Sequence, residues 1–107
     1  MALFETLLEM DDQMVNWLLH ASPTNQAERV KMKHVFALRG DLDDLLNELV
    51  AQRIKLSIAP LAEETARLNS IAGEMKRVEA TIETVDKVLA IAGTAVEICR
   101  KLVAAVA

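Results

Sequence analysis

The chain has 107 residues, of which 52% are hydrophobic, and its formal net charge is −4. This length suits one domain over residues 1–107 and is too short for two ordinary domains, and the acidic balance counts against nucleic acid as a partner. Only three glycines and two prolines are present, which disfavours a fold of many strands and turns. We therefore predict an all-α fold, a helical bundle of four or five helices built on aliphatic side chains.

The first predicted helix ends near His20, because the following sequence "ASPTN" collects residues that interrupt helices. Thr6 and Glu9 have the spacing of a capping box, so this helix is expected to begin at Thr6 or one turn earlier. Its apolar residues recur at steps of three and four, which predicts one buried stripe. The stripe consists of Leu3, Leu7, Met10, Met14, Trp17 and Leu18.

Two further helices are predicted between Asn25 and Pro60, with Asn25 and Glu28 as a second capping-box pair. The first of them is expected to stop at Gly40, and Asp41 is expected to cap the next. On this interpretation "RGD" at 39–41 is a helix boundary and not an adhesion tripeptide. The acidic run "DLDD" at 41–44 is then a favourable helix start and not a cation site.

The last predicted helix, about 60–107, repeats apolar residues every seven positions, as in a coiled coil. Unbroken, it would be about 70 Å long, whereas the preceding helices would each be about 20–30 Å. Either this helix breaks, near 80–84 or at Gly93, or a second chain covers the remainder. The predicted interface comprises Leu68, Ile71, Met75, Val78, Ile82, Val85, Leu89, Ala92, Val96, Cys99, Val103 and Val106.

The sequence offers no arrangement of side chains typical of catalysis, so we expect no catalytic, cofactor or metal site and no enzyme activity. His20 and His34 lack the spacing of metal ligands. Cys99 is expected to be buried and unreactive, as a small hydrophobic residue. The basic residues of 29–39 ("RVKMKH" and Arg39) are expected to form a solvated helix face.

These expectations favour a non-enzymatic interaction or assembly protein that self-associates through its C-terminal helix, most simply as a dimer. An unidentified protein partner would satisfy the same surface. The alternative is a membrane-active or membrane-surface protein, because residues 88–107 carry only three charged side chains. With one cysteine and an acidic N-terminus that does not resemble a signal peptide, a cytoplasmic location is expected.

Overall fold

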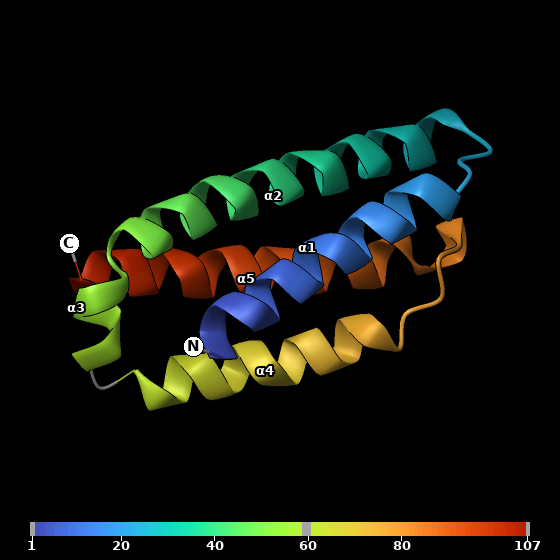
Figure 1. The fold of residues 1–107 in the computed structure, drawn as a ribbon. Helices are drawn as coiled ribbons and strands as arrows, with labels where there is room; N and C mark the ends of the chain where they lie inside the picture. The colour runs from blue at the N-terminus through green and yellow to red at the C-terminus, as the bar shows by residue number, and fades with distance from the viewer. Residues whose placement is uncertain (1, 59–60, 107) are drawn as a thin grey trace.

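The computed structural model describes residues 2–58 and 61–106, and it is helical throughout apart from short connections (Figure 1). The all-α prediction is confirmed. Four long helices form a bundle with principal extents of 47 × 22 × 17 Å. They are α1 (Ala2–His20), α2 (Gln26–Ala51), α4 (Ala62–Lys76) and α5 (Val85–Val106), with a short α3 (Arg53–Ile58) and a 3₁₀ turn η1 (Ile82–Thr84) between them.

The bundle consists of two antiparallel helical hairpins packed against each other (Figure 1). Helices α1 and α2 form the first hairpin, and α4 and α5 form the second. Across the contact between the hairpins, α1 lies beside α4 and α2 lies beside α5, each pair running in the same direction. Two ion pairs show this parallel order for α2 and α5. Lys31 pairs with Asp86, and Asp41, further along α2, pairs with Arg100, further along α5.

Helix α1 buries the stripe that its spacing predicts. Leu3, Leu7, Met10, Met14 and Trp17 are each at most 2% exposed, whereas Leu18 lies half-buried at the edge. The helix begins at Ala2, one turn before Thr6, and the hydroxyl of Thr6 donates to the Asn69 side chain at 2.8 Å. Thr6 therefore joins α1 to α4 and does not cap a helix.

Asn25 caps the N-terminus of α2 as predicted, and its side-chain oxygen accepts from the backbone N–H of Glu28 at 2.9 Å. The carboxylate of Glu28 reaches back to Thr24, accepting from its backbone N–H and from its hydroxyl. The hydrogen bond from the Thr24 hydroxyl is the main cause of the lowered pKa of Glu28. These bonds satisfy donors that a helix start would otherwise leave unpaired.

The predicted boundary at Gly40 is wrong, because α2 runs through this residue from Gln26 to Ala51. Gly40 does not have a positive φ, so it adopts no conformation that would end the helix. The buried residues of α2 form one stripe on both sides of it, and packing of this stripe outweighs the cost of about 1 kcal/mol for a glycine inside a helix. The stripe consists of Val35, Leu42, Leu46 and Leu49.

The C-terminal segment breaks at the earlier of the two positions that the sequence suggested. Helix α4 ends at Lys76, and the chain reverses through residues 77–84 before α5 begins. At Gly93, the other candidate, α5 is continuous. The boundary predicted at Pro60 lies outside the described residues, and α4 begins two positions later, at Ala62.

Candidate functional site

The twelve residues of the predicted C-terminal interface lie mainly inside the single chain. Eight of them are buried: Leu68, Met75, Ile82, Val85, Ala92, Val96, Cys99 and Val106. The other four lie half-buried: Ile71, Val78, Leu89 and Val103. The length argument behind this interface left two alternatives open, a break in the helix or a second chain that covers it. The described residues show the break, at 77–84, which folds α5 back against α2 and α4. The eight buried residues cannot contact a second copy while the bundle stays folded.

Cys99 lies in the core of α5 and is 0% exposed, so its predicted burial is confirmed. Desolvation raises the pKa of its thiol from an ordinary value of 9.0 to about 12. The thiolate is the reactive form of cysteine, and burial disfavours it here. This position is therefore unsuited to nucleophilic chemistry at neutral pH.

The reversal between α4 and α5 is fastened to the side chain of Trp17. Its indole N–H lies 2.9 Å from the hydroxyl oxygen of Thr84 and 3.2 Å from the backbone carbonyl of Thr81. The hydroxyl of Thr84 lies within donating distance of the carbonyls of Thr81 and Glu79. The sequence predicted Trp17 as a core residue, but nothing in its spacing indicated a role in holding a turn more than 60 positions away.

A small hollow lies beside this turn, lined by Gln13, Asn16, Trp17, Met75, Lys76, Val78 and Ala80. The side-chain oxygen of Gln13 is buried there without a hydrogen-bond partner among the described residues. Lys76 at its rim forms an ion pair with Glu9. The lining offers amide and ammonium groups and does not place a nucleophile beside a base.

The part of the chain that the structure describes contains no group of three His, Cys, Asp or Glu side chains able to hold a metal ion. His20 lies at the end of α1 with its Nδ1 2.8 Å from the carbonyl of Asn16, and His34 is exposed on α2. Asp41 faces Arg100 of α5 at 3.9 Å. The acidic run at 41–44 lies in mid-helix, so its predicted role as a helix start is wrong.

Arg39 and Asp11 form the best-defined ion pair between α1 and α2. The Nε and Nη2 atoms of Arg39 lie 2.9 and 3.3 Å from the two carboxylate oxygens of Asp11, which is the bidentate geometry typical of strong pairs. Arg39 thus points toward α1 whereas Asp41 points toward α5. The "RGD" sequence is neither an exposed loop nor the helix boundary that we predicted.

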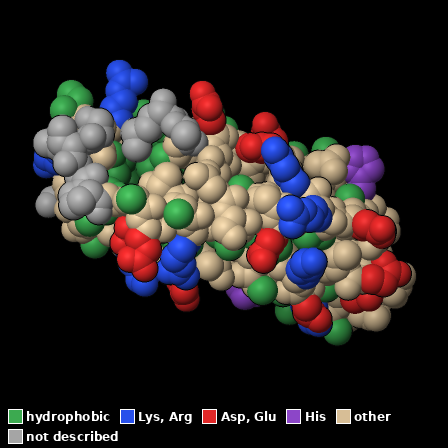
Figure 2. Space-filling model, turned by 90° about the horizontal axis from the view of Figure 1, so that it is seen from below, with side chains coloured by type: hydrophobic (Ala, Val, Ile, Leu, Met, Phe, Trp, Pro, Cys, Tyr) green, Lys and Arg blue, Asp and Glu red, His purple; other side chains and the backbone are tan. Residues whose placement is uncertain are grey.

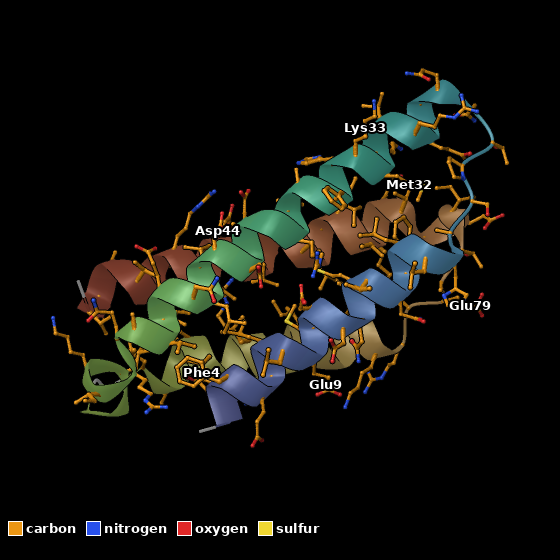
Figure 3. The ribbon with its side chains drawn as sticks, turned by 45° about the horizontal axis from the view of Figure 1, so that its top comes forward. Phe4, Glu9, Met32, Lys33, Asp44 and Glu79 are labelled. Carbon is orange, nitrogen blue, oxygen red and sulfur yellow. The ribbon has the colours of Figure 1, made fainter. Side chains whose placement is uncertain are left out.

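The charged residues on the outward side of α2 are separated by sign along the helix. Arg29 and Lys33 are exposed in its first half, and Asp44 and Glu48 are exposed in its second half. None of the four has an ion-pair partner within the described residues. Lys33 and Asp44 both project from the outer side of α2 (Figure 3). By contrast, acidic and basic side chains are interspersed on the lower face of the bundle (Figure 2).

Exposed apolar side chains are also concentrated in the first half of the chain. Phe36 is 65% exposed on α2, where Val30 is 56% exposed. All the large hydrophobic side chains that are well exposed in residues 2–58 and 61–106 belong to α1, α2 or α3: Leu8, Leu19, Val30, Phe36, Val50 and Ile54. Five of these six side chains lie on the α1–α2 hairpin, and among the described residues none lies on α4 or α5. The sequence could have revealed this distribution, because these residues fall outside the buried stripes.

Comparisons with protein-family models, with curated proteins and with solved structures found no match to this chain. Among the described helices none is long and apolar enough to cross a membrane.

Proposed function

We propose that this protein is a non-enzymatic helical assembly protein that acts by associating with itself. The observation that carries the proposal is the exposure of Phe36 on the surface of an otherwise closed bundle. A phenylalanine side chain that is 65% exposed leaves most of its ring in water. Aromatic residues in such positions are enriched at protein interfaces, where they contribute large apolar contact areas.

Two further features support association through the first hairpin. Leu8 and Leu19 are exposed on α1 and are separated by eleven residues, or about three turns, so they share one face of that helix. Val30 and Phe36 are exposed on α2. In the proposed association these side chains would supply the apolar contacts.

The apolar residues of the predicted C-terminal interface support the proposal indirectly. They supply the core that holds α2 and α5 together, so that the outer side of α2 is presented on a rigid support. The alternative of a membrane-active or membrane-surface protein depends on the apolar residues of 88–107, which the closed bundle mostly buries. Most of those that are described lie in the core: Val88, Ile91, Ala92, Ala95, Val96, Ile98, Cys99, Leu102 and Val106.

Light scattering coupled to size-exclusion chromatography tests the proposal on the purified protein. A mass near twice 11.8 kDa, falling toward the monomer mass on dilution, is the expected result. A monomer mass throughout the micromolar range would overturn it. Phe36→Ser provides the matched variant, because it removes exposed apolar surface without touching the core. It should weaken the dimer while leaving the circular dichroism spectrum unchanged.

A further inference from the structure

The outer face of α2 matches a second copy of itself when the two helices run in opposite directions. We infer that the protein forms a two-fold dimer in which α2 of one protomer pairs antiparallel with α2 of its partner. This inference rests on the proposed self-association and adds its partner surface, orientation and register. The outer face is defined here by Arg29, Val30, Lys33, Phe36, Ala37, Gly40, Asp44, Asn47 and Glu48, all of which are exposed.

The charges of this face define the register. In an antiparallel pair centred between Leu38 and Arg39, Lys33 of each protomer lies opposite Asp44 of the partner. The same centre places Arg29 opposite Glu48 of the partner. Both pairs occur twice in the dimer because of the two-fold symmetry, so four attractive pairs form at once.

Within the described residues of one protomer no ion pair competes for these charges. Lys33 and Asp44 are eleven residues apart, which is about 17 Å along the helix, too far for a pair within one chain. Within one chain Arg29 and Lys33 are like charges at a spacing of four residues, as are Asp44 and Glu48, and such pairs repel. Antiparallel pairing places each of these like-charged residues opposite a residue of the other sign, and these attractions offset the repulsions within each helix. Exposed ion pairs add little affinity, but they select orientation and register.

The middle of the outer face carries small residues, which close packing of two helices requires. With the same centre, Ala37 of each protomer lies opposite Gly40 of the partner. Both residues are exposed. No atom lies within 4 Å of the place where a Cβ of Gly40 would be, so nothing in the monomer requires a glycine there. The same holds for Gly73 and Gly93, so open space beside a glycine does not by itself mark an interface. In the proposed pairing Gly40 lies between Lys33 and Asp44, where its lack of a side chain lets two helix backbones approach.

Phe36 and Val30 supply the apolar part of the contact. Phe36 lies next to the small residues at the centre, and Val30 lies near the end, opposite Asn47 of the partner. Burial of a phenylalanine side chain removes a large apolar area from water, and the two-fold axis doubles it. At 26 residues, α2 is about 39 Å long and offers most of the 47 Å length of the bundle for this contact.

Charge reversal with reconstitution tests the pairing. Lys33→Glu and Asp44→Lys should each raise the dimer dissociation constant at least tenfold at low salt, because each places like charges opposite each other twice. An equimolar mixture of the two variants should dimerise again, since every facing pair in the mixed dimer is then attractive. Arg67→Glu is the matched control, because Arg67 is exposed on α4, away from α2, and its reversal should leave the wild-type constant unchanged.

Single cysteines report the orientation independently. Under mild oxidation Ala37→Cys should form a disulfide-linked dimer, because position 37 lies near the two-fold axis. Val30→Cys should not, because antiparallel pairing places the two copies of position 30 about 25 Å apart along the axis. The native Cys99 is buried and remains in every variant as an internal control. Equal cross-linking at positions 30 and 37 would indicate parallel helices and would overturn the inferred orientation.

The outcomes separate this inference from the function on which it rests. If wild type is a monomer, self-association itself is wrong. If wild type is a dimer and neither charge reversal weakens it, self-association stands and the α2 face is not the interface. If the single variants dissociate but their mixture does not recover, the antiparallel register is wrong. Recovery in the mixture together with cross-linking confined to position 37 would establish the arrangement.

Discussion

The indole N–H of Trp17 lies 2.9 Å from the hydroxyl oxygen of Thr84, and this contact fixes the end of α1 to the turn that precedes α5. The two residues are 67 positions apart. The contact matters for the architecture because residues 77–84 reverse the chain, and without the reversal α5 could not return along α2. Trp17 is 2% exposed, so its polar N–H needs a partner inside the protein.

Replacing Trp17 by Phe should therefore lower the free energy of unfolding by about 2–4 kcal/mol, from lost ring volume and lost hydrogen bonds together. Thr84→Val replaces the hydroxyl by a methyl group and should cost about 1–2 kcal/mol. Urea denaturation of the two single variants and of the double variant measures the coupling free energy between Trp17 and Thr84. The double variant should be less destabilised than the two single effects added together, because both act on one contact. Strict additivity would show that Trp17 and Thr84 act independently.

The reversal itself was foreseeable in part from the residues. "ATIET" brings three β-branched side chains together, and such residues are weak helix formers. Local preference could mark this stretch as a candidate break, yet it could not rank it above Gly93. The structure shows what decided between them: the turn gains hydrogen bonds from Trp17, a partner distant in sequence, whereas Gly93 lies in the middle of the helix that packs on α2.

At Gly40 the sequence predicted a helix boundary that does not exist, because packing outweighs the local preference for a helix end. A glycine followed by aspartate resembles a helix end and a new cap, and both residues fit those roles by preference alone. The buried stripe through Val35 and Leu42 nevertheless keeps one helical period across the glycine. That continuity was present in the sequence and was the better guide. The sequence could not show which helices these side chains contact: Arg39 pairs with Asp11 of α1, and Asp41 pairs with Arg100 of α5.

Gly40→Ala tests whether this residue lies inside a helix. A methyl group there would meet no atom of the same chain, and the backbone φ is not positive, so alanine fits without strain. The free energy of unfolding should rise by about 0.5–1 kcal/mol, because alanine restricts the unfolded chain and favours helix. Thermal denaturation monitored by circular dichroism measures the change. The experiment belongs at high salt and low protein concentration, so that association does not add to the measured stability.

A larger side chain at the same position separates folding from association. Gly40→Gln should keep or slightly raise the stability of the monomer, since glutamine is a good helix former in an exposed position. It should also weaken the dimer, because it holds two α2 helices apart. A loss of monomer stability in either variant would contradict a continuous α2.

Cys99 gives a prediction for alkaline pH. Its pKa in the folded protein is raised to about 12 by burial, whereas the thiol of the unfolded chain titrates near the ordinary value of 9.0. The unfolded state therefore releases the proton first, and stability that is present below pH 9 is lost as the pH rises from 9 toward 12. The urea concentration at the midpoint of unfolding should fall in the wild-type protein as the pH rises across this range. Cys99→Ala should show a shallower fall, which isolates the thiol from the titrating lysines.

The same burial predicts slow chemistry at the thiol. A thiol reagent at pH 8 should modify native Cys99 only as fast as the bundle opens, and modification should become complete within the mixing time in denaturant. Fast modification of the folded protein would place Cys99 outside the core.

Val88 and Leu89 are neighbours in the sequence but differ in burial, and this difference shows which face of α5 points into the core. Val88 is 0% exposed, whereas Leu89 lies half-buried at the edge of the core. Val88→Asp would bury a charge without a partner, at a cost of several kcal/mol. Because small domains are stable by only about 5–15 kcal/mol, this variant should be largely unfolded. Leu89→Asp can turn its carboxylate to water and should cost about 1–2 kcal/mol, leaving a folded protein.

The pair also distinguishes the two surfaces on which self-association could depend. If the outer face of α2 forms the dimer, folded Leu89→Asp should dimerise with the wild-type dissociation constant, because Leu89 lies on α5 outside that face. Light scattering of the folded variant at several concentrations measures this directly. A folded but monomeric Leu89→Asp protein would instead place the contact on the half-buried edge of α5. In that event Ile71, Val78 and Val103, the other half-buried residues of the predicted C-terminal interface, would become the residues to test with it.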